Sequence, residues 1–155
     1  MIKCHELFMG LAIEQAIKAN QLGEVPIGAV LVDKQNNILS AAHNQTVGMS
    51  DPAAHAEILA LRAGGNKLGN YRLLNTTLYV TIEPCFMCMG AIVHARVYQV
   101  VFGARDPKWG AVGSLYNFAE DDRLNHRVDV VSGICETDCA QLMQRFFQQK
   151  RELSP

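Results

Sequence analysis

Apolar and polar residues follow two different periods along the first third of the chain. Over residues 5–22 the apolar positions recur three or four residues apart, which predicts an amphipathic helix, and Gly23 offers a stop. The run over 27–32 is continuously apolar and predicts a buried strand. A polar turn over 33–37 leads into a second strand over 38–43, so we expect the two strands to form a hairpin.

The rest of the chain alternates between strand-like and helix-like segments. In order, we predict a helix that starts at Asp51–Pro52 and ends near Ala63 at Gly64–Gly65, a strand over 78–82, a helix over 85–95, a strand over 99–103, a loop over 104–126, a strand over 128–131 and a closing helix over 139–152. Strands alternating with helices favour an α/β fold. We expect a three-layer sandwich, in which one mixed five-stranded sheet carries helices on both faces, built as a single domain over residues 1–155.

The composition is ordinary for a globular domain, since 49% of the 155 residues are apolar and 19% are charged. No apolar run reaches the length of a membrane span, and Glu6 and Glu14 interrupt any signal-peptide pattern, so we expect a cytoplasmic protein. The formal net charge is −1, which means that any surface for nucleic acid must be local. Five cysteines then favour free or metal-bound thiols. We interpret Cys135 and Cys139 as small buried hydrophobic residues.

Two short motifs offer a set of metal ligands. An H-x-E motif supplies the imidazole of His55 and the carboxylate of Glu57, and a C-x-x-C motif supplies Cys85 and Cys88 on one face of a helix. Three protein ligands leave the fourth position of a tetrahedral zinc ion open, which is the layout of a catalytic site. His55 and Glu57 can both reach one ion only where a helix begins. We therefore predict His55 near a helix N-terminus, opposite the N-terminus that bears Cys85.

The charges of these groups indicate a division of labour. Zinc held by two thiolates and a neutral imidazole activates a water molecule, and the Glu57 carboxylate can shuttle its proton. This suits hydrolytic attack on an amidine-like carbon with ammonia leaving, which is deamination of a nucleobase. The competing interpretation is a structural zinc with Glu57 as a bystander. It is disfavoured because no fourth Cys or His stands at a standard spacing nearby.

The pattern H-x-E…P-C-x-x-C resembles that of the zinc-dependent cytidine/deoxycytidylate deaminase superfamily. Further stretches are similar to the bacterial tRNA-specific adenosine deaminases of the TadA type, namely Asp51–Ile58, Asn70–Leu73, Pro84–Ala91, Phe102–Lys108 and Asn125–Val128. The resemblance covers roughly residues 8–152 and implies a cytidine deaminase-like fold. It also implies conversion of adenosine to inosine at the wobble position of a tRNA anticodon, by zinc-hydroxide attack on C6 with Glu57 as the proton shuttle.

The same resemblance implies a homodimer that binds a tRNA anticodon stem-loop, with one Zn²⁺ per subunit held by His55, Cys85 and Cys88. The residues that it implies for substrate binding are Ile27, Asn44, Ala56, Asp106, Lys108, Phe147 and Arg151. In this family pattern Asn44 holds the flipped nucleotide and Ile27 forms a pocket wall. Asp106 and Lys108 resemble loop contacts to the RNA backbone, and Phe147 and Arg151 resemble positions on the helix that closes over the anticodon.

Alternatives stay open at this level. A deaminase of the same fold that acts on guanine, cytosine or a free nucleoside carries the same motif, and the salt dependence of binding would separate it from an RNA enzyme. A catalytically inactive RNA-binding member is a third hypothesis, against which Glu57 argues. Of Phe146–Phe147 we expect one ring to pack and the other to be free to stack on a base. Lys108–Trp109 suits either RNA contact or a loop anchor, and we interpret Lys108 as functional and Trp109 as structural.

Overall fold

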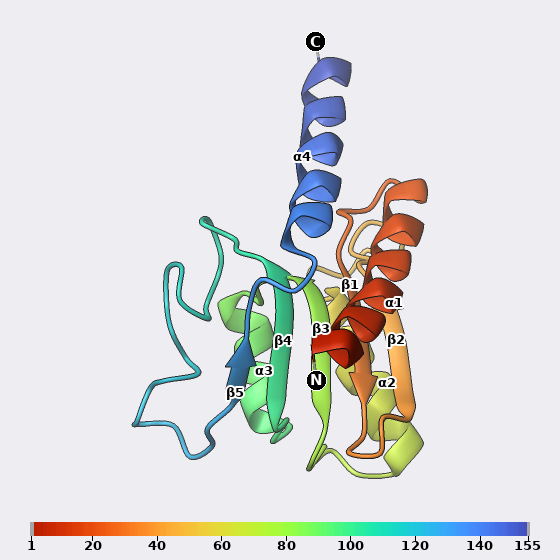
Figure 1. Ribbon diagram of the computed structural model, residues 1–155. Coiled ribbons are helices and arrows are strands. Elements are labelled where there is room, and N and C mark those ends of the chain that lie inside the picture. The colour runs from red at the N-terminus through yellow and green to blue at the C-terminus, as the bar shows by residue number, and fades with distance from the viewer. Residues whose placement is uncertain (1, 155) are drawn as a thin grey trace.

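The computed structural model describes residues 2–154, which form four helices and five strands (Figure 1). In chain order the elements are α1 (Ile2–Gln21), β1 (Gly28–Val32), β2 (Ile38–His43), α2 (Ala56–Leu68), β3 (Thr77–Ile82), α3 (Phe86–His94), β4 (Gln99–Ala104), β5 (Asp129–Val131) and α4 (Glu136–Leu153). The end of α4 extends away from the rest of the molecule (Figure 1). Among the described residues, no helix combines the length and the apolar composition needed to cross a membrane.

One mixed sheet organises the fold, in the strand order β2-β1-β3-β4-β5. β1 is antiparallel to both β2 and β3, whereas β3, β4 and β5 are parallel to one another. In the turn between β1 and β2, Oδ1 of Asp33 accepts hydrogen bonds from the backbone N–H groups of Gln35 (2.8 Å) and Asn37 (2.9 Å). The predicted hairpin and the mixed five-stranded sheet are confirmed.

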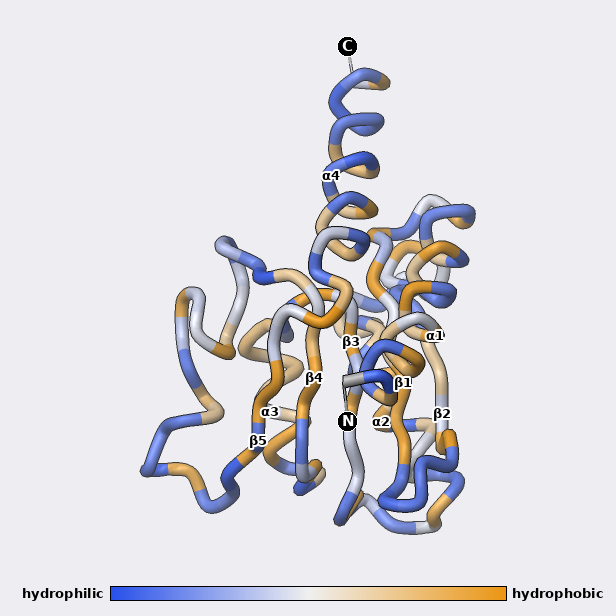
Figure 2. Tube along the Cα trace, viewed as in Figure 1, coloured by the Kyte–Doolittle hydropathy of each residue, from blue (hydrophilic) through white to orange (hydrophobic). Residues whose placement is uncertain are grey.

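Helices cover both faces of this sheet, because successive side chains of a strand point to opposite sides. One apolar cluster joins the sheet to α1 and α4 and includes Phe8, Met9, Ala12, Val30, Tyr79, Val101 and Cys139. The other joins the sheet to α2 and α3 and includes Leu31, Ala60, Leu78, Val80, Met89, Ile92 and Phe102. The three-layer sandwich is therefore confirmed. Figure 2 shows hydrophobic strands at its centre and a mostly hydrophilic α4 beyond it.

The helix α2 begins later than the sequence suggested. Oδ1 of Asp51 accepts the N–H of Ala53 (2.9 Å), and the carbonyl of Asp51 accepts the N–H of Ala54 (3.1 Å), so this segment is a turn. An aspartate that closes such a turn has the same sequence signal as a helix cap. The predicted start at Asp51–Pro52 was wrong for this reason, and His55 is the residue that precedes the helix.

The helix α2 also continues through Gly64–Gly65, where we expected it to end. An ideal Cβ at Gly64 would lie 2.5 Å from Cδ2 of Leu31, so the missing side chain lets α2 approach β1 closely. The helix ends at Gly69, which adopts the left-handed φ of 65°. The role of Gly64 is thus set by packing against the sheet.

The closing helix α4 begins at Glu136, earlier than the predicted start at Cys139. Cys135 adopts a left-handed φ of 53° before the helix, and the acidic residues Glu136 and Asp138 stabilise its first turn through the helix dipole. Cys139 lies in the second turn, is 1% exposed and packs against Gly103. Its predicted role as a buried hydrophobic residue is confirmed.

Candidate metal centre and active site

Two helix N-termini, those of α2 and α3, present the predicted metal ligands. His55 is the N-cap of α2 and Cys85 is the N-cap of α3, both with extended backbone, and neither side chain bonds back to its own helix. Both side chains are therefore free to face outward from the helix ends. The positive ends of the two helix dipoles also favour thiolate over thiol at this position.

The three ligand atoms converge on one point. Nδ1 of His55 lies 3.7 Å from Sγ of Cys85 and 3.5 Å from Sγ of Cys88, and all three atoms lie within 4.8 Å of one another. Nitrogen and sulfur atoms at about 2.1 and 2.3 Å from a tetrahedral zinc ion are themselves about 3.5–3.8 Å apart. The donor set and its spacing therefore fit Zn²⁺. The predicted opposition of the two helix N-termini is confirmed.

The pKa values of the two thiols are shifted in opposite directions. Hydrogen bonds from Cys88 and His55 lower the pKa of Cys85 to about 4, against the opposing effect of burial. The hydrogen bond to Cys85, together with burial, raises the pKa of Cys88.

Glu57 lies in the first turn of α2, beside the ligands. This residue is 3% exposed. Among the described residues, Oε1 of Glu57 is the one buried side-chain oxygen or nitrogen atom that has no hydrogen-bond partner. Burial raises the pKa of this carboxyl to about 7. An unsatisfied buried oxygen costs stability unless something other than the protein satisfies it. Glu57 is therefore placed to bond a water molecule or a substrate.

Three of the residues predicted to bind substrate meet beside His55. Asn44 is buried, its Oδ1 accepts the N–H of Ala56 (2.7 Å), and its own N–H donates to the carbonyl of Ile27 (3.1 Å). The first of these bonds fixes the side-chain amide of Asn44 and satisfies a free N–H at the start of α2. The structure thus brings Ile27, Asn44 and Ala56 together at the metal centre.

A buried carboxylate that the sequence reasoning missed fastens a loop to this centre. Glu83 is 2% exposed; its Oε2 accepts the N–H groups of Val112 (2.9 Å) and Ser114 (3.1 Å), and its Oε1 accepts the N–H of Asp106 (3.1 Å) and the hydroxyl of Ser114. Burial raises the pKa of Glu83, but these hydrogen bonds outweigh it, and the pKa is lowered. The sequence signal was a charged residue between an apolar strand and the C-x-x-C motif.

The loop that Glu83 holds carries two more predicted residues. Oδ1 of Asp106 accepts the N–H groups of Lys108 (3.0 Å) and Trp109 (3.3 Å), so this carboxylate shapes the turn that presents the loop. Lys108 itself is exposed. A bridge between Cys85 and Gly110, and the hydrogen bond from the N–H of Ala111 to the carbonyl of Pro84 (2.8 Å), join the loop to the C-x-x-C segment.

Phe147 and Arg151 lie elsewhere, on α4. This helix packs on α1, β3 and β4, in the layer opposite to the one that carries the metal ligands. Phe146 is 7% exposed and Phe147 is 44% exposed, so the prediction that one ring packs while the other stays free is confirmed. Both Phe147 and Arg151 are accessible from the outside, and their contact with RNA stays a prediction.

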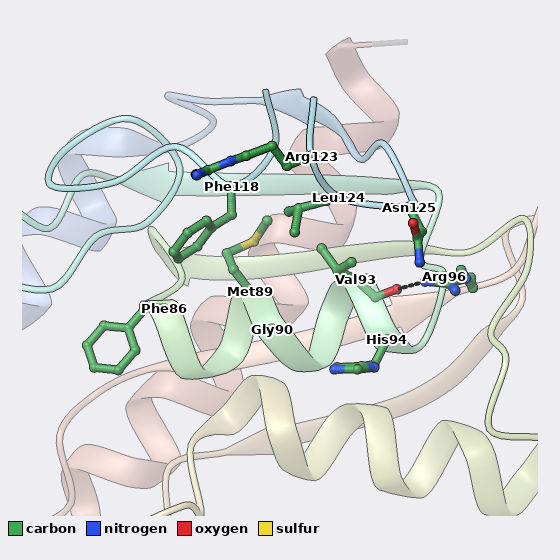
Figure 3. A pocket seen from close by; sticks show the side chains of 10 residues that line it. All are labelled: Phe86, Met89, Gly90, Val93, His94, Arg96, Phe118, Arg123, Leu124 and Asn125. Atoms are coloured by element: carbon green, nitrogen blue, oxygen red, sulfur yellow. Dashed lines mark hydrogen bonds between the residues drawn. The ribbon is translucent and has the colours of Figure 1, made fainter. Parts of the chain in front are cut away.

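A pocket of about 410 Å³ lies along the outer side of α3, but it is not the metal centre. Figure 3 shows Met89, Phe118 and Leu124 pointing toward one another inside it, while Phe86 and His94 point away. No metal ligand lines this pocket. The candidate active site is the open position between the two helix N-termini.

Comparison with known proteins agrees with this geometry. The family model of the cytidine and deoxycytidylate deaminase zinc-binding region matches residues 2–104. The tRNA-specific adenosine deaminase of Haemophilus influenzae is 52% identical over 147 residues, which are 95% of this chain and 85% of that protein. A structure from studies of A-to-I editing by tRNA:A34 deaminases at the wobble position of transfer RNA matches with a TM-score of 0.84 at 43% identity, covering 87% of this chain and 97% of that chain.

A guanine deaminase is also similar, over less of the chain. The structure of guanine deaminase from Bacillus subtilis is 38% identical with a TM-score of 0.63, and the match covers 65% of this chain and 64% of that chain. The sequence identity to tRNA-specific adenosine deaminases is higher. The chain therefore belongs to the zinc-dependent cytidine and deoxycytidylate deaminase family, in the group of the tRNA-specific adenosine deaminases.

Proposed function

We propose that the protein catalyses the hydrolytic deamination of adenosine to inosine at the wobble position of a tRNA anticodon. The observation that carries this proposal is the unpaired, buried Oε1 of Glu57 beside the converging ligands His55, Cys85 and Cys88. The group of adenosine deaminases to which the chain belongs supports the choice of substrate.

The reaction needs a water molecule, a proton shuttle and a leaving amino group. His55, Cys85 and Cys88 would hold Zn²⁺, which would supply Lewis acidity to lower the pKa of a water molecule. Oε1 of Glu57 accepts a proton from the water that attacks C6 and passes it to N1 of the adenine. The hydroxyl group now on C6 gives its proton through the same carboxylate to the amino group, which leaves as ammonia while the C6 carbonyl of inosine forms. Because Glu57 is buried, bulk water does not reach its carboxylate, and the proton passes only between the attacking water molecule and the adenine.

Binding requires the nucleotide to leave its stack, at a cost of about a few kcal/mol that is lowest in a single-stranded loop. Asn44 is pre-oriented for this step, because its Oδ1 is held by the N–H of Ala56 and the orientation of the Nδ2 donors is thereby set. Ile27 and Ala56 form the adjoining wall. Lys108 on the loop, and Phe147 with Arg151 on α4, are proposed to contact the remaining nucleotides and phosphates.

The substrate class is tested by turnover of a small panel. Zinc-loaded protein is incubated with an anticodon stem-loop that carries a wobble adenosine, and separately with free adenosine, cytidine and guanine. We expect turnover of the stem-loop alone, with binding that weakens steeply as salt is added. Turnover of a free base or nucleoside alone, with little effect of salt, would reassign the enzyme to the free-base class that includes guanine deaminase.

We also propose that the protein forms a homodimer through the layer of α2 and α3. Exposed apolar side chains lie at the C-terminal end of α2 and in the segment after it, among them Leu68 (47%), Tyr71 (69%) and Leu74 (59%). Light scattering during size-exclusion chromatography should give twice the mass of one chain, and Tyr71→Glu should give the mass of one. We also propose a cytoplasmic location, because the proposed substrate is a tRNA.

A further inference from the structure

Three exposed aromatic rings form a cluster next to the ligand Cys85. Phe86 follows it in the chain, and its ring centroid lies 6.1 Å from that of Trp109 and 6.3 Å from that of Tyr116. The three side chains are 47%, 56% and 52% exposed. We refer to Phe86, Trp109 and Tyr116 as the aromatic platform. The interpretation of Trp109 as a loop anchor does not fit an indole that is more than half exposed.

The aromatic platform is fixed relative to the metal centre. Trp109 precedes Gly110, which forms a β-bridge with Cys85. The backbone N–H of Trp109 donates to Oδ1 of Asp106 (3.3 Å). The carboxylate of Glu83 holds the same loop on both sides of Trp109, through hydrogen bonds to residues 106, 112 and 114. An ideal Cβ at Gly110 would lie 2.4 Å from Cδ of Glu83, so the loop is closely packed here. The rings thus lose little conformational freedom when a ligand binds.

The chemistry of the platform suits unpaired nucleobases. Exposed aromatic faces stack on bases of any identity, and a cation beside them attracts the phosphates. Lys108 supplies that cation next to Trp109 and is itself exposed. Since the platform adjoins Cys85, a base stacked on it belongs to a nucleotide close to the one whose base is deaminated.

We propose that the aromatic platform binds the unpaired nucleobases next to the target adenosine by stacking, with Trp109, its most exposed ring, as the main contact. This inference rests on the proposed function and adds a binding site for the neighbouring nucleotides. It makes single-stranded RNA around the adenosine, and not the adenosine alone, the recognised substrate. Each stacked base adds about a factor of ten to affinity.

The chain provides a direct probe, because Trp109 is its one tryptophan. In a zinc-loaded Glu57→Gln background, which keeps the substrate intact, Trp109 fluorescence is recorded during titration with the anticodon stem-loop. We expect quenching that saturates with binding. A matched stem-loop with abasic sites on both sides of the wobble adenosine should bind at least about tenfold more weakly and quench less.

A kinetic comparison accompanies the titration. Trp109→Ala should raise KM for the stem-loop about tenfold and leave kcat within twofold. The matched control is Tyr98→Ala, which removes an aromatic ring that is 55% exposed. Tyr98 comes just before the first residue of β4, whereas the loop that carries Trp109 follows the last, so this variant should change neither constant. Zinc content is measured for both variants.

Each contrary outcome has a distinct meaning. Turnover of the stem-loop by the wild-type protein without any change in Trp109 fluorescence overturns the proposal and leaves the proposed function intact. Fluorescence that changes with protein concentration and not with RNA assigns the platform to a second copy of the chain and also overturns it. Failure of any stem-loop to react overturns the proposed function and this inference together.

Discussion

Glu57 and Glu83 are two buried carboxylates on either side of the same metal centre, 3% and 2% exposed, yet their surroundings differ. Both oxygens of Glu83 accept hydrogen bonds from the loop that follows β4, and the pKa of Glu83 is lowered. Oε1 of Glu57 has no partner among the described residues, and burial raises the pKa of Glu57 to about 7. Burial alone therefore does not decide what a carboxylate does. A satisfied one holds structure, and an unsatisfied one is kept for a ligand.

The largest effect on activity is expected from Glu57→Gln. The amide has the shape of the carboxylate but does not shuttle a proton, so kcat should fall by about 10³-fold. The free energy of unfolding should stay the same or rise, because the variant removes an ionisable group that is buried without a partner for one oxygen. Zinc content, measured by metal analysis, should not change. Loss of zinc with normal turnover would show that Glu57 is structural.

The largest effect on stability is expected from Glu83→Gln. Whichever way the new amide is oriented, its NH₂ group faces a backbone N–H of the loop, so the variant loses hydrogen bonds and buries an unpaired donor. The free energy of unfolding, measured by chemical denaturation of the zinc-loaded protein, should fall by about 2–4 kcal/mol. An unchanged stability would mean that the loop is held by other contacts, and the contrast with Glu57 would disappear.

The pH dependence of stability sharpens the same comparison. The hydrogen bonds to Glu83 hold its pKa in the folded protein below its ordinary value of 4.5. Its stabilising contribution is therefore complete above that value and is lost as the pH falls through the lowered pKa. Denaturation of wild type and Glu83→Gln at a series of pH values should show the difference in stability shrinking under acid conditions. A difference that is independent of pH would exclude the ionised carboxylate as its source.

A smaller effect on the free energy of unfolding is expected from Ser114→Ala. The variant removes one hydroxyl donor to Oε1 of Glu83, while the N–H of Asp106 continues to satisfy that oxygen. The free energy of unfolding should fall by about 1 kcal/mol. Hydrogen exchange at the backbone amide of Asp106 should increase only slightly. A loss as large as that of Glu83→Gln would show that the hydroxyl, and not the backbone, is the main partner.

The sequence predicted the metal ligands well because their geometry depends on local features. His55 and Cys85 are brought together by two helix starts, and the spacing of His55 and Glu57 predicted the first of these although the start signal Asp51–Pro52 comes earlier in the chain. Glu83 was not recognised because its partners are 23 to 31 residues away in a loop without a regular pattern. Gly64 was misread because its function depends on the position of Leu31 in the neighbouring strand. Roles set by distant contacts were beyond the reach of pattern and spacing.

The most direct test of the central claim is to locate inosine in a reacted RNA. An anticodon stem-loop with a wobble adenosine and at least one further adenosine is incubated with zinc-loaded wild-type protein and, in parallel, with Glu57→Gln, and the products are mapped by mass spectrometry. We predict inosine at the wobble position alone, and only with the wild-type protein. Inosine at equal rates in both samples would contradict the role of Glu57, and an unreacted stem-loop beside a deaminated free base would contradict the tRNA substrate.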